Sequence, residues 1–364
     1  MTSRADLLRL RRLAHAIDGD REATPADVAR RMLAVQAQDF AAGSWALGVR
    51  TGGVTRADVL ADLDAGRIVR SWPMRGTLHF VPPEDLRWML GITTGRMIAG
   101  LAARHKQLEL DTPDFVRARD VATETLAGGA SIGRAELMEL WEANGIATAG
   151  QRGYHLIYYL AQTGLICWGP ALRTQQALVL LDEWAPQSRR LEPDEAWGEF
   201  LLRYLRGHGP ATVRDFVWWT KGTVAGAKTA RAVLGDAITA LEVDGVEYLL
   251  TAELADRAAG LAQSRREREA VHLLPAFDEY LLGYQQRDLV LDDEHFQRIV
   301  PGGNGVFQPI VVARGRVVGT WRRGKAAAGT EGRGAVDIQS FAPLTAGQER
   351  AAERASEAYR RYAS

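Results

Sequence analysis

Apolar residues recur at helical spacing along the first hundred positions, and they give way to alternating runs near residue 70. The pattern predicts a helix around 7–17, a second that starts in "TPADVARRML" and a third in "TRADVLADLDAG". Thr24 is the expected N-cap of the second helix, and Pro25 suits its first turn. "IVRSWPMRGTLHFV" has the alternation and central turn of two short strands.

The same order of elements follows in a second, diverged copy. We expect helices near 116–126, in "SIGRAELMELWEANG" and in "GYHLIYYLAQTG". "LICWGPALRTQQALVLL" then predicts two apolar strands around a Gly-Pro turn. Recurrence of a whole set of elements is a signature of repeated modules.

A third copy runs from a helix at 197–206, through "ATVRDFVWWTKG" and "TVAGAKTARAVLG", to a hairpin in "ITALEVDGVEYLLT". Thr212 and Asp215 form a capping pair, and Asp244-Gly245 is a strong signal for a two-residue turn. Helix, capped helix, further helix and two-stranded wing are the plan of a winged helix-turn-helix. We therefore predict an α+β fold of three tandem winged helices. They occupy residues 1–100, 101–190 and 191–264.

The remaining residues have short apolar runs separated by glycine-rich turns. "VHLLPAFDEYLLGY", "VFQPIVVARGRVVGTWRRG" and "AVDIQSFAPL" each predict short strands, so we expect a small β-barrel, or a sandwich, over 265–344. A final helix over 345–364 begins at Thr345, which forms a capping box with Gln348.

Composition narrows the class of protein. The 364 residues are 46% hydrophobic and 25% charged, with 45 basic and 45 acidic side chains, as in a globular protein with more than one core. No apolar run is long enough to cross a membrane, and the lone Cys167 and the absence of a secretory leader predict a cytoplasmic protein. The histidines form no metal-ligand motif, so no metal or other cofactor is expected.

The most distinctive short motif is a pair of glutamines, Gln36 and Gln38, separated by Ala37 and followed by Asp39. Near a helix end, two such amides are commonly solvated or bonded within a turn. They are also able to hold a water molecule, because each carbonyl accepts a hydrogen bond and each amide donates two. Asp39 is a rival candidate acid, with a cap on the following segment as its alternative.

Seven phrases together resemble the bacterial winged-helix DNA glycosylases of the AlkZ/YcaQ type. They are "VQAQ", "MRGTLHFVPPEDL", "LICWGP", "LDEWAP", "GHGPATVRDFVWW", "LLPAFDEYLLGY" and "GRVVGTWRR", spread over nearly the whole chain. The resemblance implies a C-shaped monomer with a DNA channel, which acts on double-stranded DNA carrying alkylated or crosslinked purines. Gln36-Ala37-Gln38 matches the glutamine–apolar–glutamine branch, which implies that Gln36 and Gln38 are catalytic, although Ala37 is smaller than the usual central residue.

Two neutral amides fit one kind of lesion. An N7-alkylated guanine already carries a positive charge, so its glycosidic bond is labile and the site needs mainly to position water; neither glutamine is a strong base. We therefore expect a monofunctional glycosylase for bulky N7-alkylguanine adducts, with crosslink unhooking as an extension. No lysine lies near the motif to form a Schiff base. The alternatives are a non-enzymatic winged-helix regulator and a member of this fold that has lost activity.

Candidate DNA contacts lie in the first wing, at the glycine-rich tip of "RIVPGGNGVFQ" and in "WRRGK". They are Arg70, Arg75, His79, Gly303, Asn304, Arg322, Arg323 and Lys325. For each arginine the alternative is a salt bridge, for His79 a place at the core edge, and for the tip a plain surface turn between strands. Asp278, beside Glu279 in "FDEYLLGY", is either a further candidate acid lining the channel or part of a packed strand.

Overall fold

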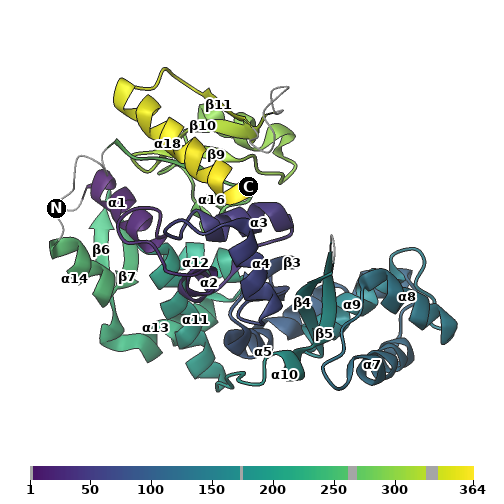
Figure 1. Cartoon of the computed structure of the whole chain (residues 1–364). Coiled ribbons are helices and arrows are strands. Elements are labelled where there is room, and N and C mark those ends of the chain that lie inside the picture. Colours follow the sequence, from purple (N-terminus) through teal and green to yellow (C-terminus); the bar gives the residue numbers. More distant parts are fainter. Residues whose placement is uncertain (1–2, 173–174, 261–268, 325–334) are drawn as a thin grey trace. The chain divides into compact units, whose positions relative to one another are not determined.

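The computed structural model (Figure 1) describes most of the chain, namely residues 3–172, 175–260, 269–324 and 335–364. It contains two compact units. Unit 1 consists of Met1–Val59 together with Trp197–Ser364, and unit 2 is the intervening segment Leu60–Ala196. The first sixty residues therefore pack with the carboxyl-terminal half of the chain. Within the described ranges, no helix has the length and apolar character needed to cross a lipid bilayer.

Unit 1 begins with two capped helices, α1 (Arg4–Ala14) and α2 (Pro25–Met32). The Thr24 side chain accepts a hydrogen bond from the backbone N–H of Asp27, and the Asp27 carboxylate accepts one from the backbone N–H of Thr24. The predicted N-cap is therefore confirmed. The chain continues through β1 (Val35–Gln36) into α3 (Phe40–Gly48) and α4 (Arg56–Asp64), which crosses into unit 2.

The rest of unit 1 follows α11 (Pro193–His208), which starts in unit 2. Its main elements are α12 (Val213–Thr220), α13 (Val224–Leu234), β6 (Ile238–Val243), β7 (Val246–Thr251), α14 (Ala252–Gly260), β8 (Val271–Leu274), α16 (Glu279–Leu282), α17 (Phe296–Ile299), β9 (Ile310–Ala313), β10 (Arg316–Arg323), β11 (Val336–Ser340) and α18 (Ala346–Ala363). The capping pairs at Thr212 and Thr345 are confirmed. So is the β6–β7 turn, where Asp244 and Gly245 have φ of 52° and 74°.

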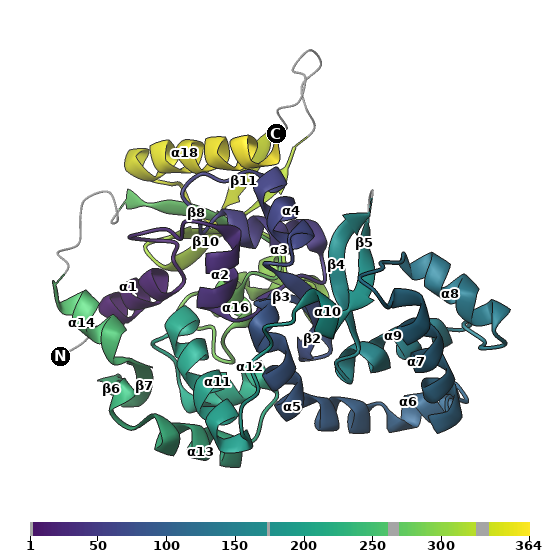
Figure 2. The same cartoon turned by 60° about the horizontal axis from the view of Figure 1, so that its bottom comes forward.

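The expected β-barrel is not present among the described residues. Strands β8 to β11 form an open antiparallel sheet in the order β11-β10-β9-β8, with β11 and β8 at its edges. Helix α18 lies along this sheet, as Figures 1 and 2 show, and Trp321 of β10 packs edge-on against Tyr359 of α18. Covering by a helix buries one face of the sheet, so closure into a barrel is not needed to protect it.

The segment "FDEYLLGY" is a short helix, α16, and not the strand expected as its alternative. The carboxylate of Asp278 accepts a hydrogen bond from the backbone of Tyr280 at 2.9 Å, which favours a helical turn over an extended strand. Strand β8 has already ended at Leu274.

Unit 2 joins two hairpins in one sheet with helices around it (Figure 2). Its elements are β2 (Val69–Met74), β3 (Thr77–Val81), α5 (Pro83–Gly100), α6 (Ala102–Gln107), α7 (Thr112–Leu126), α8 (Arg134–Ala143), α9 (Arg152–Gln162), β4 (Ile166–Leu172), β5 (Gln175–Leu180) and α10 (Leu181–Trp184). Strands β3, β2, β4 and β5 are adjacent in that order. The core of the unit includes Trp72, Trp141 and Leu156.

The predicted turn at Gly169-Pro170 is wrong. Both residues lie inside β4, at a register shift between Trp168 and Ala171. Proline has no N–H to donate to a neighbouring strand, and a bulge is one of the few places in a sheet where it is tolerated. Strands β4 and β5 pair antiparallel with Leu172 opposite Gln175, and residues 173–174 between them lie outside the described residues.

The three predicted sets of helices and hairpins are present in chain order, but they do not form three separate bodies. Residues 1–59 belong to unit 1, whereas 60–100 belong to unit 2, and the first and second hairpins share the unit 2 sheet. The assignment of each set to a winged-helix module, with the bounds given above, stays a prediction.

Unit 1 contains a buried, hydrogen-bonded group of three side chains, Arg12, Asp18 and His272. Asp18 is buried and accepts hydrogen bonds from Arg12 at 2.5 Å and His272 at 2.9 Å. Burial by itself would raise the pKa of Asp18, but the hydrogen bond and charge of His272 and the Arg12 guanidinium outweigh it and lower the pKa to about 2.

We expect Asp18 to contribute to the stability of unit 1 in a pH-dependent way. Because its folded pKa lies below the ordinary 3.8, the contribution is complete above that value and is lost as the pH falls through about 2. Urea unfolding at several pH values should show the wild type losing stability over this window more steeply than D18N. The exposed Asp20, changed to Asn, is the matched control and should follow the wild type; an identical pH dependence of D18N and wild type would contradict the role.

Candidate functional site

The Gln36-Ala37-Gln38 motif lies in the extended connection between α2 and α3 of unit 1. Leu33, with φ of 62°, ends α2, and Asp39 caps α3 by accepting a hydrogen bond from Ala42 at 3.0 Å. The alternative role predicted for Asp39, as a cap, is therefore confirmed. A cap on each side leaves the motif a short, defined length of extended chain.

Exposure alternates along the motif. Gln36 is half-buried, Ala37 is buried and Gln38 is exposed. The motif backbone lies directly against Gly43 of α3: a Cβ at position 43 would be 2.8 Å from the Ala37 Cβ and 2.9 Å from the Gln36 carbonyl oxygen. A glycine at this point of α3 and an alanine at the centre of the motif allow the close approach.

A buried carboxylate holds the other side of the motif backbone. The N–H of Gln36 donates to Oε1 of Glu279 at 3.1 Å, and Trp219 donates its indole N–H to Oε2 at 2.8 Å. Glu279 is 1% exposed, and Nε2 of His208 is 3.5 Å from the same Oε2. In the sequence Glu279 stands out only as the neighbour of Asp278, because nothing in the local pattern connects it with Gln36, 243 positions away.

Asp278 is placed differently from the carboxylate expected to line a channel. It is 3% exposed and binds both terminal nitrogens of Arg50, at 2.8 and 2.9 Å. Arg50 also donates to the carbonyl oxygens of His15 and Ala46. This placement argues against contact between Asp278 and DNA, and it gives the residue a structural role beneath the motif.

The histidine and tyrosine side chains around Asp278 and Glu279 are neutral near pH 7. Burial, followed by the nearby His208 and Arg50, holds the pKa of His15 well below its usual value, and burial also lowers the pKa of His208. Burial raises the pKa of Tyr280 to about 12. The described residues hold no group of three or more His, Cys, Asp or Glu side chains placed to bind a metal ion.

In unit 2, the predicted DNA contacts surround the β2–β3 hairpin. His79 is fully buried, so a direct contact with DNA is wrong for it and the alternative at the core is confirmed. Its Nδ1 lies 2.8 Å from the Thr77 carbonyl and therefore carries a proton, which leaves Nε2 to accept from Arg75 at 2.8 Å. His79 thus orients Arg75 at the hairpin turn. Arg70 is half-buried and reaches Gln176 at 3.4 Å.

In unit 1, the glycine-rich tip with Gly303 and Asn304 is exposed. Asn304 accepts from the backbone of Val306 at 2.9 Å. The tip joins helix α17 to β9, so the expectation of two flanking strands is wrong on its amino-terminal side.

The basic residues predicted in "WRRGK" lie at the end of β10. Arg322 is exposed and pairs with Asp337 of β11 at 2.8 Å, which is the predicted salt-bridge alternative. Arg323 is exposed, and Lys325 lies outside the described residues.

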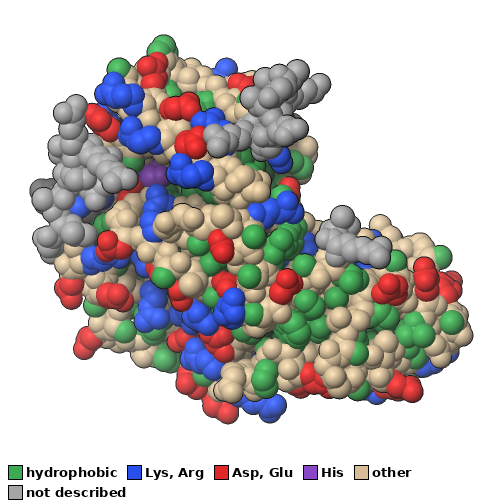
Figure 3. All heavy atoms as spheres, in the orientation of Figure 1, with side chains coloured by type: hydrophobic (Ala, Val, Ile, Leu, Met, Phe, Trp, Pro, Cys, Tyr) green, Lys and Arg blue, Asp and Glu red, His purple; other side chains and the backbone are tan. Residues whose placement is uncertain are grey.

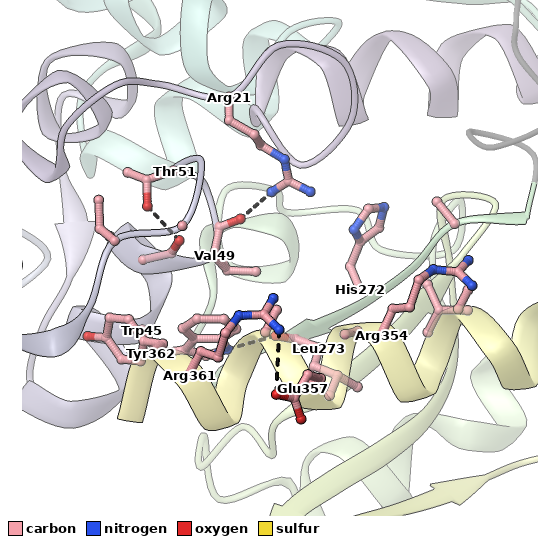
Figure 4. Close-up of a pocket in the computed structure, with 18 residues that line it drawn as sticks. Arg21, Trp45, Val49, Thr51, His272, Leu273, Arg354, Glu357, Arg361 and Tyr362 are labelled. Carbon is pink, nitrogen blue, oxygen red and sulfur yellow. Dashed lines mark hydrogen bonds and ion pairs between the residues drawn. The ribbon is translucent and has the colours of Figure 1, made fainter. Parts of the chain in front are cut away.

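A further basic site was missed by sequence analysis. A cavity of about 540 Å³ lies in unit 1 between α18, β8 and the segment 48–54, and Arg21, Arg354 and Arg361 line it (Figure 4). Arg21 donates to the Val49 carbonyl, and Arg361 lies 3.5 Å from Glu357. The signal in the sequence was the spacing of seven between Arg354 and Arg361, which places both on one face of a helix.

On the face of unit 1 that Figure 3 shows, Lys and Arg side chains lie over several parts with acidic side chains between them, in keeping with the balanced composition.

Three comparisons place this chain among known proteins. The model of a family described as DNA glycosylase AlkZ-like matches residues 29–362. An interstrand DNA cross-link repair glycosylase of Streptomyces sahachiroi is 29% identical over 311 residues, which cover 81% of each chain. The solved structure of Streptomyces sahachiroi DNA glycosylase AlkZ superposes with a TM-score of 0.81 and 23% identity, over 99% of this chain and 96% of that one, and shows a shared fold.

We expect loss of the Asp278 carboxylate to destabilise unit 1 strongly. D278A would leave the buried Arg50 guanidinium without its counter-charge, a change that costs roughly 3–5 kcal/mol in comparable buried pairs. D337A, which removes the partner of the exposed Arg322, should cost less than about 1 kcal/mol. Urea unfolding of both variants measures the difference, and similar small losses in the two would contradict the assigned role.

Proposed function

The chain belongs to the DNA glycosylase AlkZ-like family, and from that premise we propose that it hydrolyses the N-glycosidic bond of bulky N7-alkylguanine adducts in double-stranded DNA. A relative from Streptomyces sahachiroi is named for the repair of interstrand cross-links, so the proposal extends to unhooking of crosslinked guanines. The observation that carries the proposal is the Gln36-Ala37-Gln38 segment, in which the two amides belong to an anchored, extended chain with Gln38 at the surface.

The reaction requires little from the protein at the base. Water attacks C1′ of the sugar, the bond from C1′ to N9 breaks, and its electron pair neutralises the positive charge of the alkylated ring. The attacking water loses its proton to solvent. In this scheme the carbonyl oxygens of Gln36 and Gln38 orient the water and their amides bind neighbouring oxygens.

Neutral amides also limit the range of substrates. An ordinary purine leaves only after protonation, and a glutamine supplies no acid for that step. We infer that the site is selective for lesions that are already cationic, which protects undamaged DNA. The monofunctional character of the proposed enzyme rests on the absence of lysine from the first 105 residues, so none near the motif in sequence is available to form a Schiff base.

The alternative of a non-enzymatic winged-helix regulator is not favoured, because the matching family is one of glycosylases.

For DNA binding we propose that arginines contact backbone phosphates, with the exposed Arg323, Arg354 and Arg361 and the half-buried Arg75 as the main groups. The tip with Gly303 and Asn304 is proposed to enter a groove, and the protein to act as a monomer.

We expect Q36A and Q38A to slow excision by about 10²–10³-fold while duplex binding stays nearly unchanged, because each removes a group that positions water. The assay is single-turnover release of a bulky N7-alkylguanine from a labelled duplex, read as abasic sites. Q187A, at an exposed glutamine of unit 2, is the matched control and should retain full activity. Parallel losses of binding and excision in both motif variants would show that the pair is structural.

We expect the double variant R354A/R361A to bind duplex DNA more weakly and with a shallower dependence on salt. Arg354 makes no ion pair with any residue that the structure describes, so its charge is available to a phosphate. Each lost phosphate contact should reduce the log–log salt slope by about 0.9. R119A, at an exposed arginine of α7 paired with Asp120, is the control. An unchanged slope in R354A/R361A would exclude the cavity from DNA binding.

A further inference from the structure

The backbone of the glutamine motif is bound by a buried charged side chain. The N–H of Gln36 donates a hydrogen bond to Oε1 of Glu279, at 3.1 Å. Burying a carboxylate costs several kcal/mol unless donors surround it, and a neutral backbone carbonyl would satisfy the same N–H at less cost. The presence of a buried carboxylate at position 279, in spite of its cost in stability, indicates that the position of its oxygens matters for the Gln36 backbone.

The carboxylate is itself held from two directions. Trp219 of α12 donates to Oε2 at 2.8 Å, so the two oxygens serve two different donors. Glu279 is the first residue of α16, whose N-cap Asp278 is bound by both terminal nitrogens of the buried Arg50. The position of the carboxylate is therefore set by α12 and by the segment after α3 as well as by its own helix.

A buried histidine completes the surroundings of Glu279. Nδ1 of His208 lies 3.1 Å from the Tyr204 carbonyl and so carries a proton, which leaves Nε2 of the neutral ring with a lone pair. That lone pair is 3.5 Å from Oε2 of Glu279, and Nε2 makes no hydrogen bond with any described residue. The ring limits the space of the carboxylate without taking either of its hydrogen bonds.

The opposite side of the motif is held by the close contact with Gly43, where no side chain fits between α3 and the Ala37 backbone. The motif thus lies between a hydrogen-bonding carboxylate and a helix surface. Because the direction of a side chain follows from its backbone, the two contacts together determine where the amides of Gln36 and Gln38 point.

We propose that Glu279 is a positioning residue for excision: its carboxylate fixes the Gln36 backbone, and through it the amides that orient water. This inference rests on the proposed function. Glu279 touches no reacting atom in this scheme and acts only through the motif. Displacement of catalytic groups by about 1 Å lowers rates by about 10²-fold, which sets the scale of the expected effect.

The decisive variant is E279Q, which keeps the size of the side chain. The Gln36 and Trp219 N–H groups face different oxygens of the carboxylate, and an amide replaces one of these oxygens with an NH2 group, which cannot accept; one of the two donors therefore loses its acceptor. Single-turnover excision by E279Q should be about 10- to 100-fold slower than wild type at saturating enzyme, with duplex affinity unchanged within about twofold. W219F, which removes one donor and keeps an aromatic ring, should lower the rate in the same direction by a smaller factor.

A double-mutant cycle separates positioning from general destabilisation. If Glu279 acts through Gln36, E279Q should slow a Q36A enzyme much less than it slows the wild type. D114N is the matched control, because Asp114 is a buried carboxylate of unit 2 that pairs with Arg117 and Arg152, far from the motif in sequence. It should lower the melting temperature and leave the excision rate unchanged.

Every result of these assays either supports or contradicts the positioning role of Glu279. Unchanged excision by E279Q, or an equal loss in the Q36A and wild-type backgrounds, would overturn the role of Glu279 while leaving the proposed function intact. Full excision by Q36A itself would overturn the role of Glu279 together with the catalytic role of Gln36, whereas no excision by the wild type would overturn the proposed function. If E279Q does not fold, the same cycle with W219F applies, and an equal loss in both backgrounds there would also overturn the proposal.

Discussion

Two adjacent buried carboxylates organise unit 1. Asp278 and Glu279 are buried, so each requires donors from the protein. Asp278 obtains them from Arg50 and Glu279 from Gln36 and Trp219. Arg50 and Gln36 belong to the first 59 residues of the chain, and these bonds help to explain why that segment packs with the carboxyl-terminal half in one unit.

This arrangement separates the tasks of structure and chemistry. The charges of Asp278 and Glu279 are buried and bound by protein donors, and within the Gln36-Ala37-Gln38 motif the exposed side chain is the amide of Gln38. In the proposed reaction the substrate supplies the positive charge that drives departure of the base. On this proposal an acid placed at the base would extend cleavage to normal purines, and burial removes Asp278 and Glu279 from that role.

The sequence predicted those features that depend on near neighbours. Thr24 as a cap, Asp244-Gly245 as a turn and the order of helices and hairpins all follow from local propensities, and the structure confirms them. Features set by distant contacts were wrong or missed. The barrel failed because α18 covers the sheet, and the role of Glu279 beneath the motif was missed because its partner is 243 residues away. The pair of glutamines was visible in the sequence, but its catalytic role was inferred from the family resemblance, since two neighbouring amides are more often solvated or bonded within a turn.

The long separation between Gln36 and Glu279 has a consequence for synthesis of the protein. A ribosome makes both glutamines early, but the carboxylate beneath them is added only when more than three-quarters of the chain exists. A nascent chain, or a truncated product of a premature stop codon, carries the motif without its support. With the proposed role of Glu279, base excision therefore depends on translation of more than three-quarters of the chain.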